Sequence, residues 1–378
     1  MKPTKLPASI AGIASKSPAE ALGPDSRYVV LADLRLGNGR GNDESIKRKR
    51  ALFDILGSWY LPRGYTLVLD GDIEDLRRFW LKDILAAWAE LYAVFDAFRE
   101  KGRLRKIAGE RDLALLRLRS YPYEINHALR LDGKSRSILI LHGHQASEPY
   151  VGRDYVSDYM VHWLGSGAQP PARPKAPAED AKTRFRVERR LYRAGCELGM
   201  MIVEGHARRP LFESRTNRDS VRAEVERLLR EGDPGRDPTK IDRLLAIYRR
   251  EERRNPKRRA PSGSAYDQRS LVVPCLFSPG SAWAGSVGGG RTLRMLEIDG
   301  DTVSLARWAK ADRWGDFPRK AMSRGALGGA PGASLDFEGP ESLDGTLYSR
   351  CRPRRASIDE LFERIALLCS HEAKGDLS

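Results

Sequence analysis

Cysteine is scarce in this chain, and its scarcity excludes two kinds of small cross-linked domain. The 378 residues include four cysteines, Cys196, Cys275, Cys351 and Cys369, and none of them lies at Cys-x-x-Cys spacing. Such spacing matches neither a disulfide framework nor a zinc ribbon. Unpaired cysteines are typical of a reducing compartment, so the sequence predicts a cytoplasmic protein.

Long apolar runs are also missing. No stretch approaches the ~20 apolar residues that a membrane-spanning helix needs, so we predict no transmembrane segment. Residues 1–26 are rich in Pro, Ala and Ser and contain no continuous apolar core, so they predict no signal peptide and a disordered N-terminal segment. Peripheral contact with a membrane stays open.

Acidic residues are too few to balance the basic ones. The chain has 66 Lys and Arg against 51 Asp and Glu, a formal net charge of +15. A basic protein is expected to meet anions, which include phosphorylated small molecules, nucleic acid and acidic membrane surfaces. The arginine-rich run at 249–261 favours a solvated helix end over a nucleic-acid contact, because few aromatic residues accompany it.

Short apolar segments alternate with amphipathic helical ones along the first half of the chain. This alternation, with apolar runs typical of strands buried on both faces, predicts an α/β fold. The predicted strands lie in 27–39, 65–72, 104–109, 136–145 and 199–210, and the predicted helices in 45–62 and 73–102.

Each of these predicted strands ends in a polar signature. The signatures are Asp33, Gly71-Asp72, Gly109-Glu110, His142-Gly143-His144 and Gly205-His206. A single one would indicate a turn or a helix cap. Because ligands of open α/β folds bind beyond the carboxyl ends of the strands, five in this order predict one site.

The rest of the chain adds elements around this unit. Residues 165–182 predict a flexible excursion, and 211–268 an insertion with charged helical segments at 218–231 and 238–254. Residues 270–283 and 292–308 predict strands, the latter with a hairpin turn at Asp299-Gly300. The segment 309–355 predicts irregular structure, and 357–370 an amphipathic helix capped by Ser357. We therefore expect one domain over 27–308, which includes the insertion, and a C-terminal region over 309–378.

The strand-end motifs resemble those of calcineurin-like metallophosphoesterases. The motifs are "ADLRLG", "GDIED", "GERD", "HGHQ" and "GHARRP". The branch that hydrolyses UDP-diacylglucosamine is most similar, and the resemblance covers 27–210 and 270–308, where "FSPGSAW" matches a further strand. It implies a four-layer sandwich of two mixed β-sheets flanked by helices, and a hydrolase acting on a phosphoester or pyrophosphate. In that family, two metal ions polarise the phosphoryl oxygens and a bridging hydroxide attacks in line.

The resemblance transfers to these residues only in part. Asp33 matches a first-site ligand, Asp72 the bridging carboxylate, and His142 and His206 second-site ligands. Asp75 and Asp112 also match motif positions. The departures are Arg35 and Arg208 at the two first-site histidines, Glu110 at the asparagine, and Arg111 at the histidine that serves the leaving group.

Arginine is a fixed cation and does not coordinate a divalent metal. We therefore expect no dinuclear centre. In place of the first metal we predict an ion-pair cluster of Asp33, Arg35, Asp72 and Arg208, in which the guanidinium groups replace the metal's charge.

Two alternatives stay open for the second site. Asp72, Glu110, His142 and His206 are oxygen and nitrogen ligands that suit one Mn, Zn or Fe ion. In the other alternative, Glu110 pairs with an arginine and the site holds no metal.

Two main functions follow from these substitutions. The first is a phosphoesterase with one metal, in which His144, Arg35 and Arg208 bind the phosphorylated substrate, with catalytic residues Asp33, Arg35, Asp72, Arg111, Asp112 and Arg208. The second is a pseudoenzyme that binds a phosphate ligand or a protein without hydrolysis. Because one well-placed electrostatic group contributes ~10²–10³ to the rate, the combined losses favour the second. Nucleic-acid binding through the basic insertion is a more distant alternative.

Overall fold

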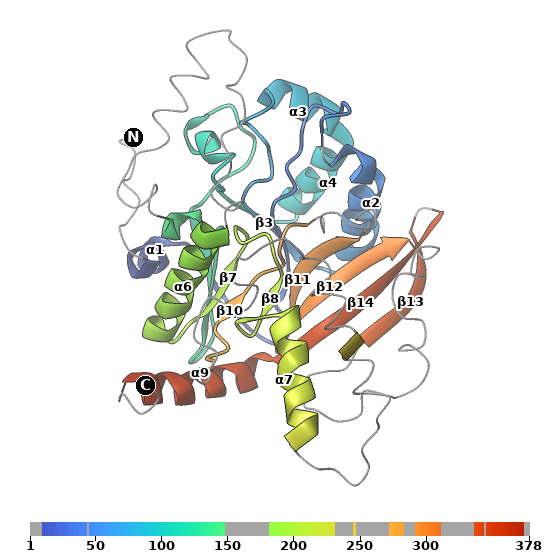
Figure 1. Cartoon of the computed structure of the whole chain (residues 1–378). Coiled ribbons are helices and arrows are strands. Elements are labelled where there is room, and N and C mark those ends of the chain that lie inside the picture. The colour runs from blue at the N-terminus through green and yellow to red at the C-terminus, as the bar shows by residue number, and fades with distance from the viewer. Residues whose placement is uncertain are drawn as a thin grey trace.

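The computed structural model describes residues 10–43, 45–147, 181–230, 245–246, 272–282, 292–310, 336–343 and 345–373. Within these ranges the protein is a mixed α/β structure with two large mixed sheets (Figure 1). The predicted excursion at 165–182, the helical segment at 238–254 and the arginine run at 249–261 lie almost wholly outside the described residues.

The seven-stranded sheet carries the first three predicted strands. In spatial order it consists of β13 (Asp336–Leu343), β14 (Thr346–Ser357), β12 (Thr302–Lys310), β11 (Leu293–Asp299), β2 (Arg27–Leu31), β3 (Thr66–Asp70) and β4 (Leu104–Ile107). Strands β2, β3 and β4 are parallel, whereas β11 to β14 pair antiparallel. The carboxyl ends of the three parallel strands therefore meet at one edge.

The five-stranded sheet carries the other two strands of the predicted site. Its order is β1 (Ala19–Ala21), β5 (Ala128–Asp132), β6 (Ser137–Leu141), β7 (Met201–Glu204) and β10 (Leu276–Phe277). Strands β6 and β7 are parallel, so His142 and His206 follow at the same edge. A small separate ladder joins β8 (Leu211–Phe212) to β9 (Arg215–Thr216).

Alternation along the strands places neighbouring residues in different cores. In β2, Val29 belongs to a core that includes Leu52 of α2 (Lys49–Asp54) and residues of α3 (Leu81–Ala87) and α4 (Ala89–Glu100). The next residue, Val30, belongs to a core shared with Ile140 and Val203 of the other sheet. Since period-2 alternation buries both faces, the strands lack a polar face, as their sequences indicated.

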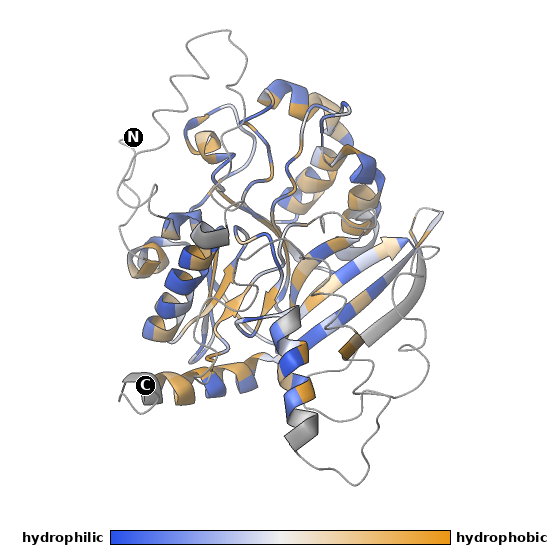
Figure 2. Ribbon diagram, viewed as in Figure 1, coloured by the Kyte–Doolittle hydropathy of each residue, from blue (hydrophilic) through white to orange (hydrophobic). Residues whose placement is uncertain are grey.

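A third core covers the far face of the five-stranded sheet. There Ile202 of β7 packs with Leu191 of α6 (Ala181–Leu198), Ile13 of α1 (Ile10–Lys16) and Ile365 of α9 (Ile358–Ala373). Figure 2 shows apolar colour on β7 and β10 and polar colour on α6. No helix of the described segments is long and apolar enough to cross a membrane.

Several predicted elements are confirmed. Strands β2, β3, β4, β6 and β7 lie inside the five predicted segments. Strands β11 and β12 form the hairpin, in which Asp299 pairs with Thr302 and Gly300 has φ +59°. Helix α9 begins after Ser357, whose Oγ accepts the backbone N–H of Glu360 at 3.4 Å. Helix α7 (Asn217–Arg230) matches the first charged helix of the insertion.

Other expectations need correction. The N-terminal segment is not wholly disordered, because α1 and β1 lie within it and Ile13 is buried in the third core. Residues 73–80 are not helical, and Glu74 bridges to Leu36 instead. The helix α6 was not predicted at all. Its high content of charged residues hid the apolar face formed by Val187 and Leu191.

The C-terminal region is also more regular than expected. Strands β13 and β14 occupy part of the segment predicted to be irregular, and β14 pairs with both β12 and β13. Tyr348 packs into the first core, and Arg350 is buried beside it. The Pro and Arg content of this segment argued against a strand, but pairing with a preformed sheet edge outweighed that local preference.

Candidate functional site

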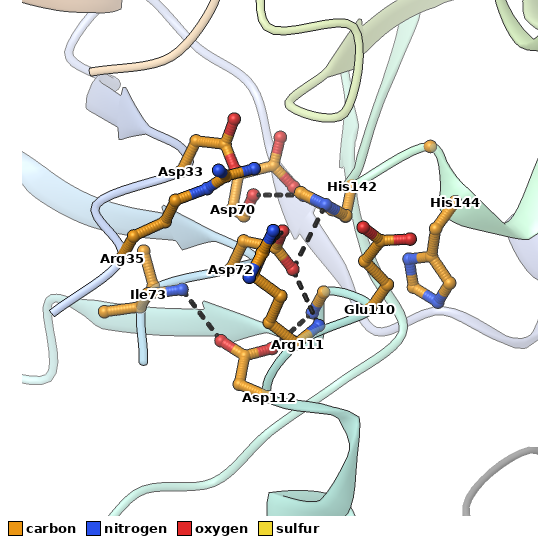
Figure 3. Close-up of polar contacts among 12 residues, drawn as sticks. Asp33, Arg35, Asp70, Asp72, Ile73, Glu110, Arg111, Asp112, His142 and His144 are labelled. Atoms are coloured by element: carbon orange, nitrogen blue, oxygen red, sulfur yellow. Dashed lines mark hydrogen bonds and ion pairs between the residues drawn. The ribbon is translucent and has the colours of Figure 1, made fainter. Parts of the chain in front are cut away.

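The strand-end residues of both sheets meet in one place (Figure 3). We call this group the strand-end cluster; it consists of Asp33, Arg35, Asp72, Glu110, Arg111, His142, His144, His206 and Arg208. His142 connects the two sheets, because its Nδ1 lies 2.8 Å from the Asp70 carbonyl oxygen and its Nε2 lies 3.5 Å from Asp72 Oδ1. The structure thus brings nine of the ten predicted site residues together, and the tenth, Asp112, lies beneath them.

The loops after β2, β3 and β7 share an unusual backbone conformation. Asp33, Arg35, Asp72 and Arg208 all have φ between +52° and +58°, a region that side chains with a Cβ rarely adopt. Backbone hydrogen bonds join the loops after β2 and β3, and among them are Asp33 N–H to Gly71 O at 3.1 Å and Arg35 N–H to Asp72 O at 3.0 Å. The pairing aims the side chains of neighbouring loops at one another.

Gly109 allows the third loop to approach closely. A Cβ on Gly109 would lie 2.2 Å from the backbone N of Asp72, a distance that no side chain tolerates. The glycine that ends the "KIAG" stretch is therefore required by the contact between the loops after β3 and β4.

Asp33 is bracketed by two guanidinium groups. Arg35 Nε lies 3.1 Å from Asp33 Oδ1, and Arg208 Nε lies 3.1 Å from Asp33 Oδ2. Burial lowers the pKa of Arg35, but the charge of Asp33 raises it, and the net shift is upward. This part of the predicted ion-pair cluster is present in the structure.

Asp72 is paired differently from the prediction. Its closest partner is Arg111, whose backbone N–H donates to Oδ1 at 2.8 Å and whose guanidinium Nε lies 3.4 Å from Oδ2. Arg111 also donates to Asp75 Oδ1 at 2.8 Å. Burial raises the pKa of Asp72, but the charges of His142, Arg111 and Arg35 outweigh burial and hold it below its usual range. Arg111 therefore takes the place that the prediction gave to Arg35 and Arg208.

The three histidines have different electrostatic environments. Burial lowers the pKa of His142, but Asp72 and other nearby carboxylates outweigh it and raise the pKa to about 9. Burial and then the charge of His142 lower the pKa of His206 to about 3, and both also lower the pKa of His144. The ring centroids of His144 and His206 lie 5.5 Å and 5.4 Å from that of His142. At neutral pH the cluster therefore contains one cationic histidine between two neutral ones.

Glu110 faces an arginine that sequence reasoning did not single out. Arg77 Nη1 lies 3.5 Å from Glu110 Oε1, and both side chains are almost fully buried. Burial and the charge of Asp72 raise the pKa of Glu110. This contact matches the alternative in which Glu110 pairs with an arginine. Arg77 lies two residues after the "GDIED" motif, and this position was the signal that could have identified it.

The predicted second-site ligands do not form a metal site as they are arranged. Within the described residues, no group of three or more His, Cys, Asp or Glu side chains is placed to hold a metal ion. The oxygens of Asp72 already face Arg111 and His142, and Glu110 faces Arg77. These four side chains therefore do not fit a resident metal in this arrangement.

Asp112 lies beneath the cluster and organises its loops. Its oxygens accept the backbone N–H of Gly109 at 2.6 Å and that of Ile73 at 2.9 Å. The fully buried Lys106 lies 3.6 Å from Asp112 and 2.6 Å from Glu74. Asp112, predicted as catalytic, thus holds backbone in this structure.

Sequence reasoning missed Lys106, the buried partner of Asp112, and its second partner Glu74. Glu74 accepts the hydroxyls of Tyr92 and Tyr121, both at 2.6 Å, in addition to Lys106. A lysine directly before the apolar Ile107 in "LRKIAG" was the available signal, because a buried ammonium group needs a carboxylate partner.

Comparison with known proteins adds little to this geometry. No protein-family profile matches the sequence, and no curated protein matches it. A solved structure that matches is titled a dimetal phosphatase from Danio rerio, with 13% identity over 51% of this chain and 73% of that chain. Its TM-score of 0.27 is too low to carry an argument about fold or activity.

Proposed function

We propose that this chain is a metallophosphoesterase-like protein that binds a phosphate-bearing ligand at the strand-end cluster without two-metal hydrolysis. The observation that carries the proposal is the pairing of Asp33. Each of its two oxygens lies 3.1 Å from a guanidinium Nε, that of Arg35 or of Arg208. In metallophosphoesterases those two positions are metal-binding histidines, so here fixed cations stand where the first ion would.

The four-layer order of helices, sheet, sheet and helices is part of this proposal. Its support comes from the three cores described above, one shared between the sheets and one on each outer face. The order of the five motifs along the chain and their convergence at one edge support the same assignment.

The charges around the cluster favour an anionic ligand. Arginine side chains contact the carboxylates of the cluster: Arg35 and Arg208 contact Asp33, Arg111 contacts Asp72 and Asp75, and Arg77 contacts Glu110. Arginine recognises phosphate through several N–H donors in a fixed fork. The side chain of Arg208 is 28% exposed whereas that of Arg35 is 5% exposed, so a ligand would approach from the Arg208 side.

The same substitutions argue against hydrolysis. A guanidinium group can stabilise phosphoryl oxygens, but it cannot bind and acidify a water molecule as a metal ion does. Arg111 cannot protonate a leaving group at neutral pH, because Asp72 and Asp75 raise its pKa further despite its burial. The strand-end cluster therefore has groups that can bind phosphate, and none of its described residues replaces the metal that would generate the nucleophile.

A second candidate is a phosphoesterase with a single metal. It is favoured by the Nε2 atom of His206, a buried nitrogen with no hydrogen-bond partner among the described residues, beside His142. Binding of a metal there would require Asp72 and Glu110 to leave their arginines. A protein partner or nucleic acid at the basic insertion remains a further alternative.

Calorimetric titration with inorganic phosphate tests the main proposal. We expect saturable binding that weakens roughly 10- to 100-fold in Arg208→Gln, since one charged hydrogen-bonding group contributes roughly 1.5–3 kcal/mol. Arg27→Gln is the matched control, because Arg27 Nε also lies 3.1 Å from an aspartate oxygen, that of Asp299, far from the cluster. Equal affinities of the two variants, or no binding by the unmodified protein, would refute phosphate binding at this cluster.

Metal analysis and phosphatase assays test the second half of the proposal. We expect no hydrolysis of a phosphomonoester or a phosphodiester in Mn, and less than one bound metal per chain. Two metals per chain would refute the replacement of the first ion by arginines. One metal and a measurable rate, both lost in His206→Ala, would establish the single-metal candidate instead.

A further inference from the structure

Two thiols approach each other on the side of the five-stranded sheet that α6 covers. Cys196 lies in the last turn of α6, and Cys275 immediately precedes β10, 79 residues later in the chain. Their sulfur atoms are 4.0 Å apart and are not bonded. Cys275 is fully buried, whereas Cys196 is partly exposed. One member of the pair is therefore accessible to a small reagent, and the other is held behind it.

Cys275 is held rigidly against α6. Its backbone N–H donates to Ser214 Oγ at 3.1 Å, and its carbonyl accepts the N–H of Ile202 at 2.7 Å. Its Sγ lies 3.6 Å from the carbonyl oxygen of Tyr192 in α6. A Cβ on Gly195 would lie 2.9 Å from this sulfur, so the glycine leaves the room that the sulfur occupies.

We propose that Cys196 and Cys275 form a disulfide when the protein is oxidised by a peroxide. A disulfide requires an S–S distance of about 2.05 Å, so the sulfurs must approach by roughly 2 Å. Because Cys275 is fixed at the sheet, a rotation of the Cys196 side chain and a small adjustment of the last turn of α6 supply this movement.

The chemistry balances with peroxide as the only oxidant. The Cys196 sulfur attacks one peroxide oxygen, the O–O bond breaks, and a sulfenic acid and one water form. The Cys275 sulfur then attacks the Cys196 sulfur and displaces the hydroxyl, which leaves as a second water with the Cys275 proton. Two thiols are oxidised and one peroxide is reduced to two waters.

The bond would fasten α6 to the edge of the five-stranded sheet. On α6, Glu188 accepts the Arg209 Nε–H at 2.7 Å, and Arg190 donates to the Ala146 carbonyl at 2.8 Å. Arg209 is next to Arg208 in the chain, and Ala146 lies in the same turn as His144, so both partners adjoin the strand-end cluster. The oxidised state would thus fix the helix that supports two of the cluster's loops. This inference does not depend on the proposed phosphate binding.

The test is peptide mapping of the full chain after treatment with hydrogen peroxide. Free thiols are blocked by alkylation, and the digest is analysed without reduction. We expect one cross-linked peptide that joins Cys196 to Cys275, together with a rise in Tm of about 5 °C that dithiothreitol reverses, because the cross-link closes a long loop. If peroxide leaves all four cysteines available to alkylation, the proposal is wrong.

Variants separate this pair from the other cysteines. Cys196→Ser removes the partly exposed member, and we expect it to abolish both the cross-linked peptide and the rise in Tm. Cys369→Ser is the matched control, because Cys369 is also partly exposed, and we expect it to change neither. A cross-link to Cys369, to Cys351 or to a second chain, or oxidation of Cys196 that stops at the sulfinic acid, would overturn the proposal.

Discussion

At the scale of single residues, the strand-end cluster consists of buried charges, each of which is stabilised by an oppositely charged neighbour. Asp33 is 1% exposed and Arg35 is 5% exposed, so each would be costly to bury alone. Removing one partner of a buried pair leaves the other charge desolvated and uncompensated. The cost of a substitution here therefore depends on what remains beside it.

Arg35→Met tests this dependence. The substitution keeps an unbranched apolar side chain and removes the cation, so Arg208 is the arginine left against Asp33. We expect a loss of about 3 kcal/mol in the free energy of unfolding, measured by urea denaturation. Arg27→Met, which breaks an exposed pair with Asp299, should cost less than about 1 kcal/mol. Equal costs would show that the Asp33 pair behaves as a surface ion pair.

Glu204→Gln tests a buried carboxyl group. Burial and then the charge of Glu188 raise the pKa of Glu204 to about 8. Because the folded pKa lies above the unfolded value near 4.5, the folded state keeps a proton that the unfolded state has lost between these pH values. The unmodified protein should therefore lose stability as pH rises from about 5 to 8, by at most about 1.4 kcal/mol per pH unit from this group.

In Glu204→Gln this slope should flatten, because glutamine does not titrate. The measurement is the free energy of unfolding at several pH values between 5 and 9 for both proteins. Glu226→Gln is the control, since Glu226 forms an exposed pair with Arg222. An unchanged slope in Glu204→Gln would mean that Glu204 is ionised in the folded protein at neutral pH.

At the scale of elements, the loops after β3 and β4 depend on a lysine below them. Lys106 of β4 pairs with Glu74 of one loop and lies near Asp112 of the other, and all three side chains are fully buried. Asp72 and Arg111 are carried by these loops. The orientation of the cluster therefore depends on a residue that does not belong to it.

Lys106→Met should destabilise the protein by about 3–5 kcal/mol, because it leaves two buried carboxylates without a cation. The double variant Lys106→Met/Glu74→Gln should recover part of that loss, since glutamine is neutral and can still accept the tyrosine hydroxyls. A double-mutant cycle by urea unfolding measures the coupling, which we expect to exceed about 1 kcal/mol. Additive costs would show that Lys106 and Glu74 act independently.

The elements also show where sequence reasoning succeeds. Strands β2, β3 and β7 could be predicted because apolar residues fill both faces, a pattern that depends on the strand alone. Strands β13 and β14 could not, because their regularity comes from pairing of β14 with β12 and of β13 with β14. Local composition says nothing about a partner that lies elsewhere in the chain.

For the candidate site, the sequence predicts which residues come together but not which of them pair with each other. The position of each polar residue relative to a strand end predicted its place in the cluster, and all the predicted residues except Asp112 meet there. Which arginine pairs with which carboxylate depends on loop conformations with positive φ at Asp33 and Asp72, and spacing does not encode these. This is why Arg111 rather than Arg35 or Arg208 lies against Asp72, and why Arg77 was missed.

At the scale of the whole molecule, the C-terminal region is part of the core. Strand β14 pairs with β12, and α9 contributes Ile358 and Leu361 to the core between the sheets and Ile365 to the outer one. The region therefore completes both sheets' packing.

Deletion of residues 336–378 should abolish cooperative folding, because it exposes the edge of β12 and removes residues from all three cores. The measurement is thermal unfolding followed by near-ultraviolet circular dichroism. The control deletion, 374–378, begins after the end of α9 and should leave Tm within about 2 °C of the full chain. A cooperative transition in the longer deletion would show that the remaining chain folds by itself.

The pairing of Asp33 with both Arg35 and Arg208 also restricts which single substitutions this protein can tolerate. A change of Arg35 alone to histidine removes a cation without supplying a complete set of metal ligands, and a change of Arg208 alone does the same. Each intermediate is expected to be less stable than the starting protein and no better at holding an ion. A metal site at Asp33 would therefore require both arginines to change together, because either change alone destabilises the protein.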